Sequence, residues 1–155
     1  MTEVVFLDSS VLFNILEVPH KCSDRASVID EFKKLVGDGA TLVFPLTAVI
    51  ETGNVIAQLA GHDRRVCMER FVRLLQQALS TTAPWAVSGV PWDGNFLSAL
   101  IDGGDRRRPL VEYATMGIGS GDASLLLEIE FYRARVPSAT PIRLWTLDKA
   151  LSAHC

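Results

Sequence analysis

Short apolar runs alternate along this chain with segments whose apolar residues have helical spacing. Val4–Leu7 is fully apolar and rich in β-branched side chains, and it stops at Asp8. A similar run covers residues 41–44, and a last strand is expected at 143–147, directly before Asp148. Short, continuous apolar runs are typical of strands that are buried on both faces, as in parallel sheets. The alternation therefore predicts an α/β fold, a three-layer α/β/α sandwich around a short parallel sheet.

Helical spacing and capping residues fill the stretches between these strands. Asp93 is expected to cap one helix, and Ser120, Gly121 and Asp122 to cap another. Gly61 is expected to end a helix, because glycine is common just after the last turn. An irregular strand is expected over residues 85–92. The expected helices cover residues 11–16, 23–36, 47–60, 63–79, 93–101, 110–116 and 123–133.

Length and composition favour one ordered domain over residues 1–155. The chain has 48% hydrophobic residues and a formal net charge of −3, which excludes intrinsic disorder. Because there is no overall basic charge, any binding of nucleic acid has to come from a local patch or a bound metal. Arg106–Arg108 is the densest basic run. It either follows a nucleic-acid backbone or lies in a solvated loop whose charge Asp102 and Asp105 partly offset.

The cysteines and the chain's apolar segments exclude several other classes. Cys22, Cys67 and Cys155 are far apart and odd in number, so neither a disulfide framework nor a zinc site is indicated. The acidic start differs from a signal peptide, and polar residues and prolines interrupt the uncharged stretch 74–92. We therefore expect a cytoplasmic protein without a membrane span.

Four acidic residues stand in otherwise apolar surroundings. Asp8 and Asp148 follow strands, whereas Glu51 and Asp122 lie near the starts of helices, so all four are expected at the carboxyl edge of the sheet. Each acid alone also has a structural explanation, as a helix cap or a partner in an ion pair. Together they repel one another, and a fold tolerates such a cluster only with a cation or with raised pKa values. Oxygen ligands alone suit Mg²⁺ or Mn²⁺.

In its ordered motifs the chain resembles the PIN-domain ribonucleases, especially the VapC-type toxins. The family's first acid ends a strand, as Asp8 does in Val5-Phe6-Leu7-Asp8-Ser9-Ser10-Val11-Leu12. Its second is a Glu early in a helix, which matches Glu51, and its third begins an Asp-Ala helix, which matches Asp122. Its fourth lies in a Thr-x-Asp motif after a strand, which matches Thr146-Leu147-Asp148. The resemblance extends over nearly the whole chain.

The resemblance implies a Mg²⁺- or Mn²⁺-dependent endoribonuclease that hydrolyses RNA, with Asp8, Glu51, Asp122 and Asp148 as its catalytic and metal-binding residues. It further implies a homodimer and an antitoxin-like inhibitor protein as partners. The apolar helix faces, together with Trp85 and Trp92, also led us to expect a dimer interface. Ser9 and Thr146 are candidates to donate hydrogen bonds to a carboxylate or a ligand water. The chain departs from the family at Ser10, where many relatives have Asn, and in lacking a further strand after the Thr-x-Asp motif.

Other interpretations of an Asp at a strand end remain to be compared. A receiver domain needs an acidic pair after its first strand, and a haloacid-dehalogenase-type phosphatase needs Asp-x-Asp at that point. Ser9 and Ser10 disfavour both classes. The remaining alternative is a PIN-like module that does not cut and serves in binding or assembly.

Overall fold

The structure is a computed structural model that describes residues 2–105 and 107–154. The order of its elements follows the predicted alternation of strands and helices. The elements are β1 (Val4–Leu7), α1 (Ser9–Ile15), α2 (Arg25–Gly37), β2 (Thr41–Phe44), α3 (Leu46–Ala57), α4 (Gly61–Leu79), β3 (Trp85–Val87), α5 (Gly94–Asp102), α6 (Leu110–Thr115), α7 (Ser120–Arg133), β4 (Ile142–Trp145) and α8 (Lys149–Ser152).

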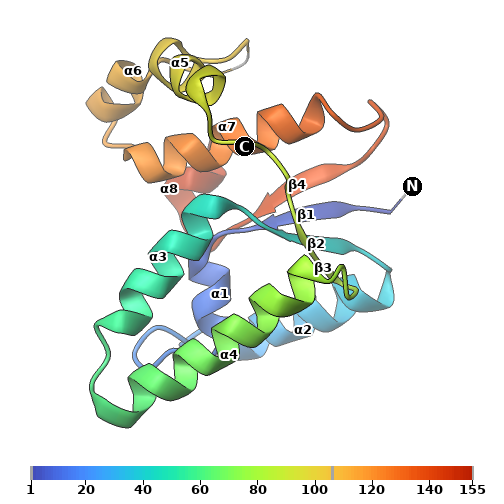
Figure 1. Ribbon diagram of the computed structural model, residues 1–155, viewed down its shortest axis with the longest axis vertical. Helices are drawn as coiled ribbons and strands as arrows, with labels where there is room; N and C mark the ends of the chain where they lie inside the picture. Colours follow the sequence, from blue (N-terminus) through green and yellow to red (C-terminus); the bar gives the residue numbers. More distant parts are fainter. Residues whose placement is uncertain (1, 106, 155) are drawn as a thin grey trace.

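The four strands form one parallel sheet in the order β3-β2-β1-β4. β1 is central, and Val4 is in register with Thr41 of β2 and with Ile142 of β4. All four residues of β1 are buried, as the continuous apolar run predicted. Helices flank the sheet on both faces, so the predicted three-layer α/β/α architecture is confirmed (Figure 1).

Alternate residues of β1 supply the two halves of the core. Val5 and Leu7 pack in the cluster that also holds apolar residues of α1, α2, α3 and α4. Val4 and Phe6 pack on the other face against Leu125 of α7. Figure 1 shows α7 lying across this second face, with α5 and α6 outside it. Helices connect each strand to the next, so all four strands run in the same direction. Their carboxyl ends therefore lie at one common edge of the sheet.

Several helix boundaries differ from the predicted ones. Gly61 begins α4 instead of ending the preceding helix, which stops at Ala57 with Gln58 as its C-cap. The expected cap of α5 is confirmed, because the Asp93 side chain accepts a hydrogen bond from the Phe96 N–H. The predicted capping role of Ser120–Asp122 is wrong, since Gly119 is the N-cap of α7 and these residues form its first turn.

The two tryptophans behind the expected dimer interface differ in their exposure. Trp85 is only 5% exposed and stacks between Phe32 and Phe44, at ring-centroid distances of 5.6 and 5.1 Å. It belongs to the core and gives no reason for a dimer. Trp92, which lies after the short strand β3, is 39% exposed.

Cys22 and Cys67 are free thiols, and burial raises the pKa of Cys67; Cys155 lies outside the described residues. In the stretches 2–105 and 107–154, no helix combines the length and apolar character needed to cross a membrane.

Candidate functional site

Asp8 lies at the end of β1, and two hydroxyl groups hold its carboxylate in place. The Ser10 Oγ donates to Asp8 Oδ2 over 2.7 Å, and the Thr146 Oγ1 donates to the same oxygen over 2.8 Å. Asp8 is the N-cap residue of α1, yet its side chain makes no capping hydrogen bond. Asp8 is only 5% exposed, and its carboxylate accepts one hydroxyl from the first turn of α1 and one from the segment after β4.

The same two hydroxyls also tie the segment after β4 to α1. The Leu147 N–H donates to Ser10 Oγ, and the Asp148 N–H donates to Thr146 Oγ1, each over 3.0 Å. Each hydroxyl thus accepts from the backbone and donates to Asp8. Such a connected arrangement fixes the orientation of the carboxylate. It leaves Asp8 Oδ1 without a hydrogen-bond partner among the described residues.

Glu51 is held by the residue next to Asp8. The Ser9 Oγ donates to Glu51 Oε2 over 2.9 Å. Glu51 also meets the first turn of α7, because a Cβ built on Gly121 would lie 2.7 Å from Glu51 Oε1 and 3.4 Å from Thr47 Cγ2. Only a glycine at position 121 lets α3 and α7 approach this closely without displacing Glu51.

Asp122 shows that the acids from different elements come together. Its pKa is raised to about 6, first by burial and then by the negative charges of Asp8, Glu51 and Asp148. The four acids belong to the carboxyl edge of the sheet, where β1 and β4 end and α3 and α7 begin (Figure 1). The structure therefore brings all four residues named from the sequence into one electrostatic neighbourhood.

Asp148 is the most exposed of the four and has a structural role as well. Its Oδ1 accepts from the Ala150 and Leu151 N–H groups, over 2.9 and 3.3 Å, so it caps α8. Asp148 therefore has the helix-capping role expected for a single acid, and its negative charge also raises the pKa of Asp122. Because Asp8 is buried and Asp148 is exposed, the cluster is open to solvent on one side.

Among the described residues, the negative charge of the cluster is not offset by an ion pair. Across residues 2–105 and 107–154, no Lys or Arg side chain forms an ion pair with any of the four acids. Within the basic run, the Arg107 Nη1 donates to the His154 carbonyl over 2.7 Å, and Arg107 lies 3.7 Å from Glu130. Arg108 pairs with Glu112 at 3.7 Å. These partners replace the expected Asp102 and Asp105, and Arg106 lies outside the described residues.

The chemistry of the donor set fits a hard divalent cation. The side chains facing the cluster offer carboxylate and hydroxyl oxygens, which are the ligands that Mg²⁺ and Mn²⁺ prefer. Thr47, one turn before Glu51 on α3, has a buried hydroxyl without a hydrogen-bond partner. As the side chains stand in the described ranges, no three acidic, His or Cys residues are grouped closely enough to enclose an ion.

Two contributors to this site, and one buried acid on the same helix as Asp122, did not follow from the sequence pattern. Ser10 was noted only as a departure from Asn, although a hydroxyl two residues after a strand-end Asp is well placed to contact it. Gly121 was expected to help cap a helix, whereas its role is to admit Glu51. Glu128 was not singled out at all. Its spacing of three residues from Leu125 and four from Ser124 was the available signal, because it puts an acid on a face of α7 that is buried.

No family model matches the chain, and no curated protein or solved structure matches it either. The function of the acidic cluster is therefore inferred from its own geometry and charge.

Proposed function

We propose that this chain is a PIN-like, metal-dependent endoribonuclease that hydrolyses RNA phosphodiester bonds at Asp8, Glu51, Asp122 and Asp148. The observation that carries the proposal is the state of Asp122, whose pKa is raised first by burial and then by three other carboxylates, while no basic side chain of residues 2–105 and 107–154 forms an ion pair with any of the four acids. A cluster of this kind is costly when all its members are charged, and a divalent cation removes that cost.

Each acid has a role that follows from its surroundings. Asp8 and Asp122 are the proposed direct ligands, since Asp8 is fixed by two hydroxyls and Asp122 feels the charge of all the others. Glu51, held by Ser9, and the exposed Asp148 complete the ligand set or hold its waters. A bound Mg²⁺ or Mn²⁺ supplies Lewis-acid chemistry, which activates water and offsets charge on the phosphate.

The acids of this chain also orient and accept protons. A carboxylate of the cluster that does not bind the metal directly orients the attacking water or accepts its proton. Ser10 and Thr146 keep Asp8 from turning away, and Ser9 does the same for Glu51. The open side near Asp148 admits a chain-like substrate.

The proposal includes partners and a location. Exposed apolar side chains on α5, on α6 and at the C-cap of α6 support a homodimer through that face; they are Leu97, Ile101, Val111 and Met116. An antitoxin-like inhibitor protein and a cytoplasmic site of action complete the proposal, by analogy with VapC-type toxins. Sedimentation at micromolar concentration is expected to give a dimer, and a species of 17.0 kDa alone would contradict that part.

The decisive experiment is cleavage of mixed RNA by the purified chain with Mg²⁺ or Mn²⁺, with and without EDTA, beside a single-stranded DNA of the same sequences. We expect cleavage of RNA that requires the metal. The Asp8→Asn variant keeps the size of the side chain but loses the charge, so its rate should fall by about 10²-fold or more.

Circular dichroism and melting curves show whether Asp8→Asn is folded. A well-folded Asp8→Asn protein that cuts RNA as fast as the parent would end the proposed mechanism. A parent that binds RNA or a partner protein and never cuts would favour the non-catalytic PIN-like module instead.

A further inference from the structure

Glu128 is a buried acid that the proposed chemistry does not use. It lies in the middle of α7 and is only 2% exposed, which is less than any of the four acids of the cluster. Among the described residues, no basic side chain forms an ion pair with it. Keeping a carboxylate at such a depth is costly unless hydrogen bonds satisfy it.

Those hydrogen bonds come from two other segments of the chain. The Leu46 N–H donates to Glu128 Oε2 over 3.1 Å, and the Ser88 Oγ donates to Oε1 over 2.5 Å. Burial raises the pKa of Glu128, while the hydrogen bonds from Ser88, Leu46 and Trp92 act in the opposite direction. The carboxylate thus joins α7 to the start of α3 and to the segment between β3 and α5.

The start of α3 needs an acceptor that its own sequence does not provide. Its N-cap residue is Pro45, which makes no side-chain capping bond, and Leu46 is the first residue of the helix. The first N–H groups of a helix have no partner within the helix, and a negative charge is favourable beside them. Glu128 of α7 therefore caps α3 from a different helix.

The same pair of helices also meets inside the acidic cluster. Leu46 of α3 contacts Glu128, and five residues later Glu51 meets Gly121, seven residues before Glu128 on α7. The two helices therefore run in opposite directions and touch at two points, which are about one and a half turns apart on α3 and about two turns apart on α7. If the first turn of α3 moved along α7 near Glu128, Glu51 would move relative to Asp122.

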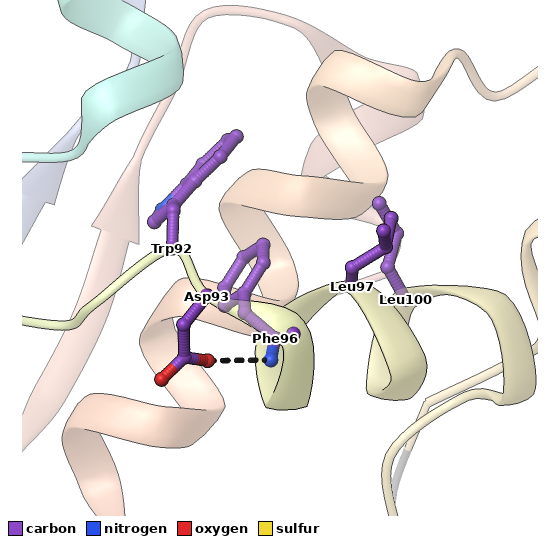
Figure 2. Close-up of a pocket in the computed structure, with 6 residues that line it drawn as sticks. Trp92, Asp93, Phe96, Leu97 and Leu100 are labelled. Carbon is purple, nitrogen blue, oxygen red and sulfur yellow. Dashed lines mark hydrogen bonds between the residues drawn. The ribbon is translucent and has the colours of Figure 1, made fainter.

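The third segment at Glu128 leads into α5. Figure 2 shows Trp92 and Phe96 beside α7, together with the bond from the Phe96 N–H to Asp93 that begins α5. The Trp92 and Phe96 rings stack at 4.6 Å, and they line a largely apolar pocket of about 470 Å³. Ser88 thus anchors this segment to Glu128 through Oε1, a bond separate from that of Leu46 to Oε2, which provides a matched control.

We propose that Glu128 is a positioning residue for the metal site, which holds the first turn of α3 against α7 so that Glu51 faces Asp122. This inference rests on the proposed function. Residues that orient ligands from behind commonly change metal affinity by about 10- to 100-fold, and a displacement of about 1 Å at a reacting group costs about 10²-fold in rate.

The test compares three variants of the full chain. Glu128→Leu removes both acceptor oxygens, Glu128→Gln keeps one of them, and Ser88→Ala removes one bond from the segment before α5 while leaving the bond to Leu46 of α3 in place. The readouts are hydrogen exchange of the first-turn amides of α3, Mn²⁺ affinity by calorimetry, and RNA cleavage at saturating Mn²⁺.

We expect the first turn of α3 to exchange faster in Glu128→Leu, with Mn²⁺ affinity lower by about 10-fold or more and a matching loss of cleavage. Glu128→Gln should be intermediate, which keeps the test valid if the leucine variant does not fold. Ser88→Ala should change Mn²⁺ affinity by less than about twofold.

Faster exchange with an unchanged Mn²⁺ affinity would overturn the inference, because Glu128 would then only stabilise the fold. A loss of affinity in Ser88→Ala as large as in Glu128→Leu would also overturn it. Failure of the proposed function is distinguishable, since the parent itself would then bind no Mn²⁺ and cut no RNA, and both proposals would fall together.

Discussion

Two acids on the same helix, Asp122 and Glu128, have raised pKa values for the same first reason and yet have opposite surroundings. Burial is the largest cause in both cases. The further causes at Asp122 are three carboxylates that raise its pKa, whereas those at Glu128 are three hydrogen-bond donors that lower it. Burial alone therefore does not distinguish the proposed ligand Asp122 from Glu128; the groups that face each acid do.

Their positions along α7 explain the contrast. Asp122 lies in the first turn, at the edge where strands end and helices begin. Glu128 lies among residues that pack over the sheet and under α5, such as Leu127 and Ile129. A carboxylate at the position of Glu128 is tolerated only when hydrogen-bond donors of the protein reach it. At the edge of the sheet, solvent or a cation can satisfy a carboxylate instead.

The largest expected effect separates the two acids in catalysis. Asp122→Asn removes a ligand charge at constant size, so we expect RNA cleavage to fall by about 10²-fold or more. Glu128→Gln should lose less, since its effect reaches the cluster only through α3. Initial rates at saturating Mn²⁺ measure both. A larger loss in Glu128→Gln than in Asp122→Asn would invert the comparison.

A second prediction concerns the sign of the change in stability without metal. Asp122→Asn relieves repulsion and should raise the free energy of unfolding at pH 7. Glu128→Leu leaves the Leu46 N–H and the Ser88 hydroxyl without their acceptor and should lower that free energy by about 1–3 kcal/mol. Urea titrations in EDTA measure both changes. If the two variants shifted stability in the same direction, the contrast between the acids would be lost.

A third prediction uses the close approach of α3 and α7. The Gly121→Ala variant puts a Cβ where Glu51 Oε1 now lies within 2.7 Å, so Glu51 has to move. We expect Mn²⁺ affinity to fall by about 10-fold, comparable to the loss of a residue that orients a ligand. Stability should change little, because alanine in a helix gains roughly 0.5–1 kcal/mol over glycine and offsets part of the strain.

Gly53→Ala is the matched control for this prediction. Gly53 lies in α3, and a Cβ there would have nothing within 4 Å. The control should gain stability and keep its Mn²⁺ affinity. Equal Mn²⁺ affinities for Gly121→Ala and Gly53→Ala would show that the position of Glu51 does not matter to the metal.

The strands and the four acids were predictable because they depend on local sequence. Val4–Leu7 and Thr41–Phe44 are strands with the predicted bounds, since an apolar, β-branched run has few other stable environments. Asp8 and Asp148 follow strands, and parallel strands have a common carboxyl edge, so topology alone brings these acids near one another.

The remaining features depend on contacts between distant segments. The Ser10 bond to Asp8 is local, but its second partner, the Leu147 N–H, is 137 residues away. The Glu128 bond to Leu46 spans 82 residues, and no periodicity within α7 predicts which donor an inward-facing acid will meet. Trp85 was assigned to an interface for a similar reason, because only the packed structure places it between Phe32 and Phe44.

The smallest expected effect is the dependence of stability on pH. The pKa of Asp122 is about 6 in the folded protein against 3.8 for an ordinary aspartate, so the folded state binds this proton more tightly than the unfolded state does. Stability is therefore greatest below about pH 4 for this group and declines as the pH rises through about 6. The raised pKa of Glu128 adds a decline of the same sign.

Asp122→Asn isolates the contribution of the cluster from that of Glu128. Melting temperatures between pH 4.5 and 7.5 in EDTA should fall for the parent by a few degrees, since about 1 kcal/mol corresponds to roughly 2–4 °C in a chain of this size. The decline should be shallower in Asp122→Asn, and what remains reports Glu128. Mn²⁺ should raise the parent's melting temperature mainly above pH 6, where the carboxylates have lost their protons, and should leave the variant nearly unchanged. Parallel pH profiles for parent and variant would show that the neighbouring carboxylates do not act on Asp122, and the case for a cation there would lose its electrostatic basis.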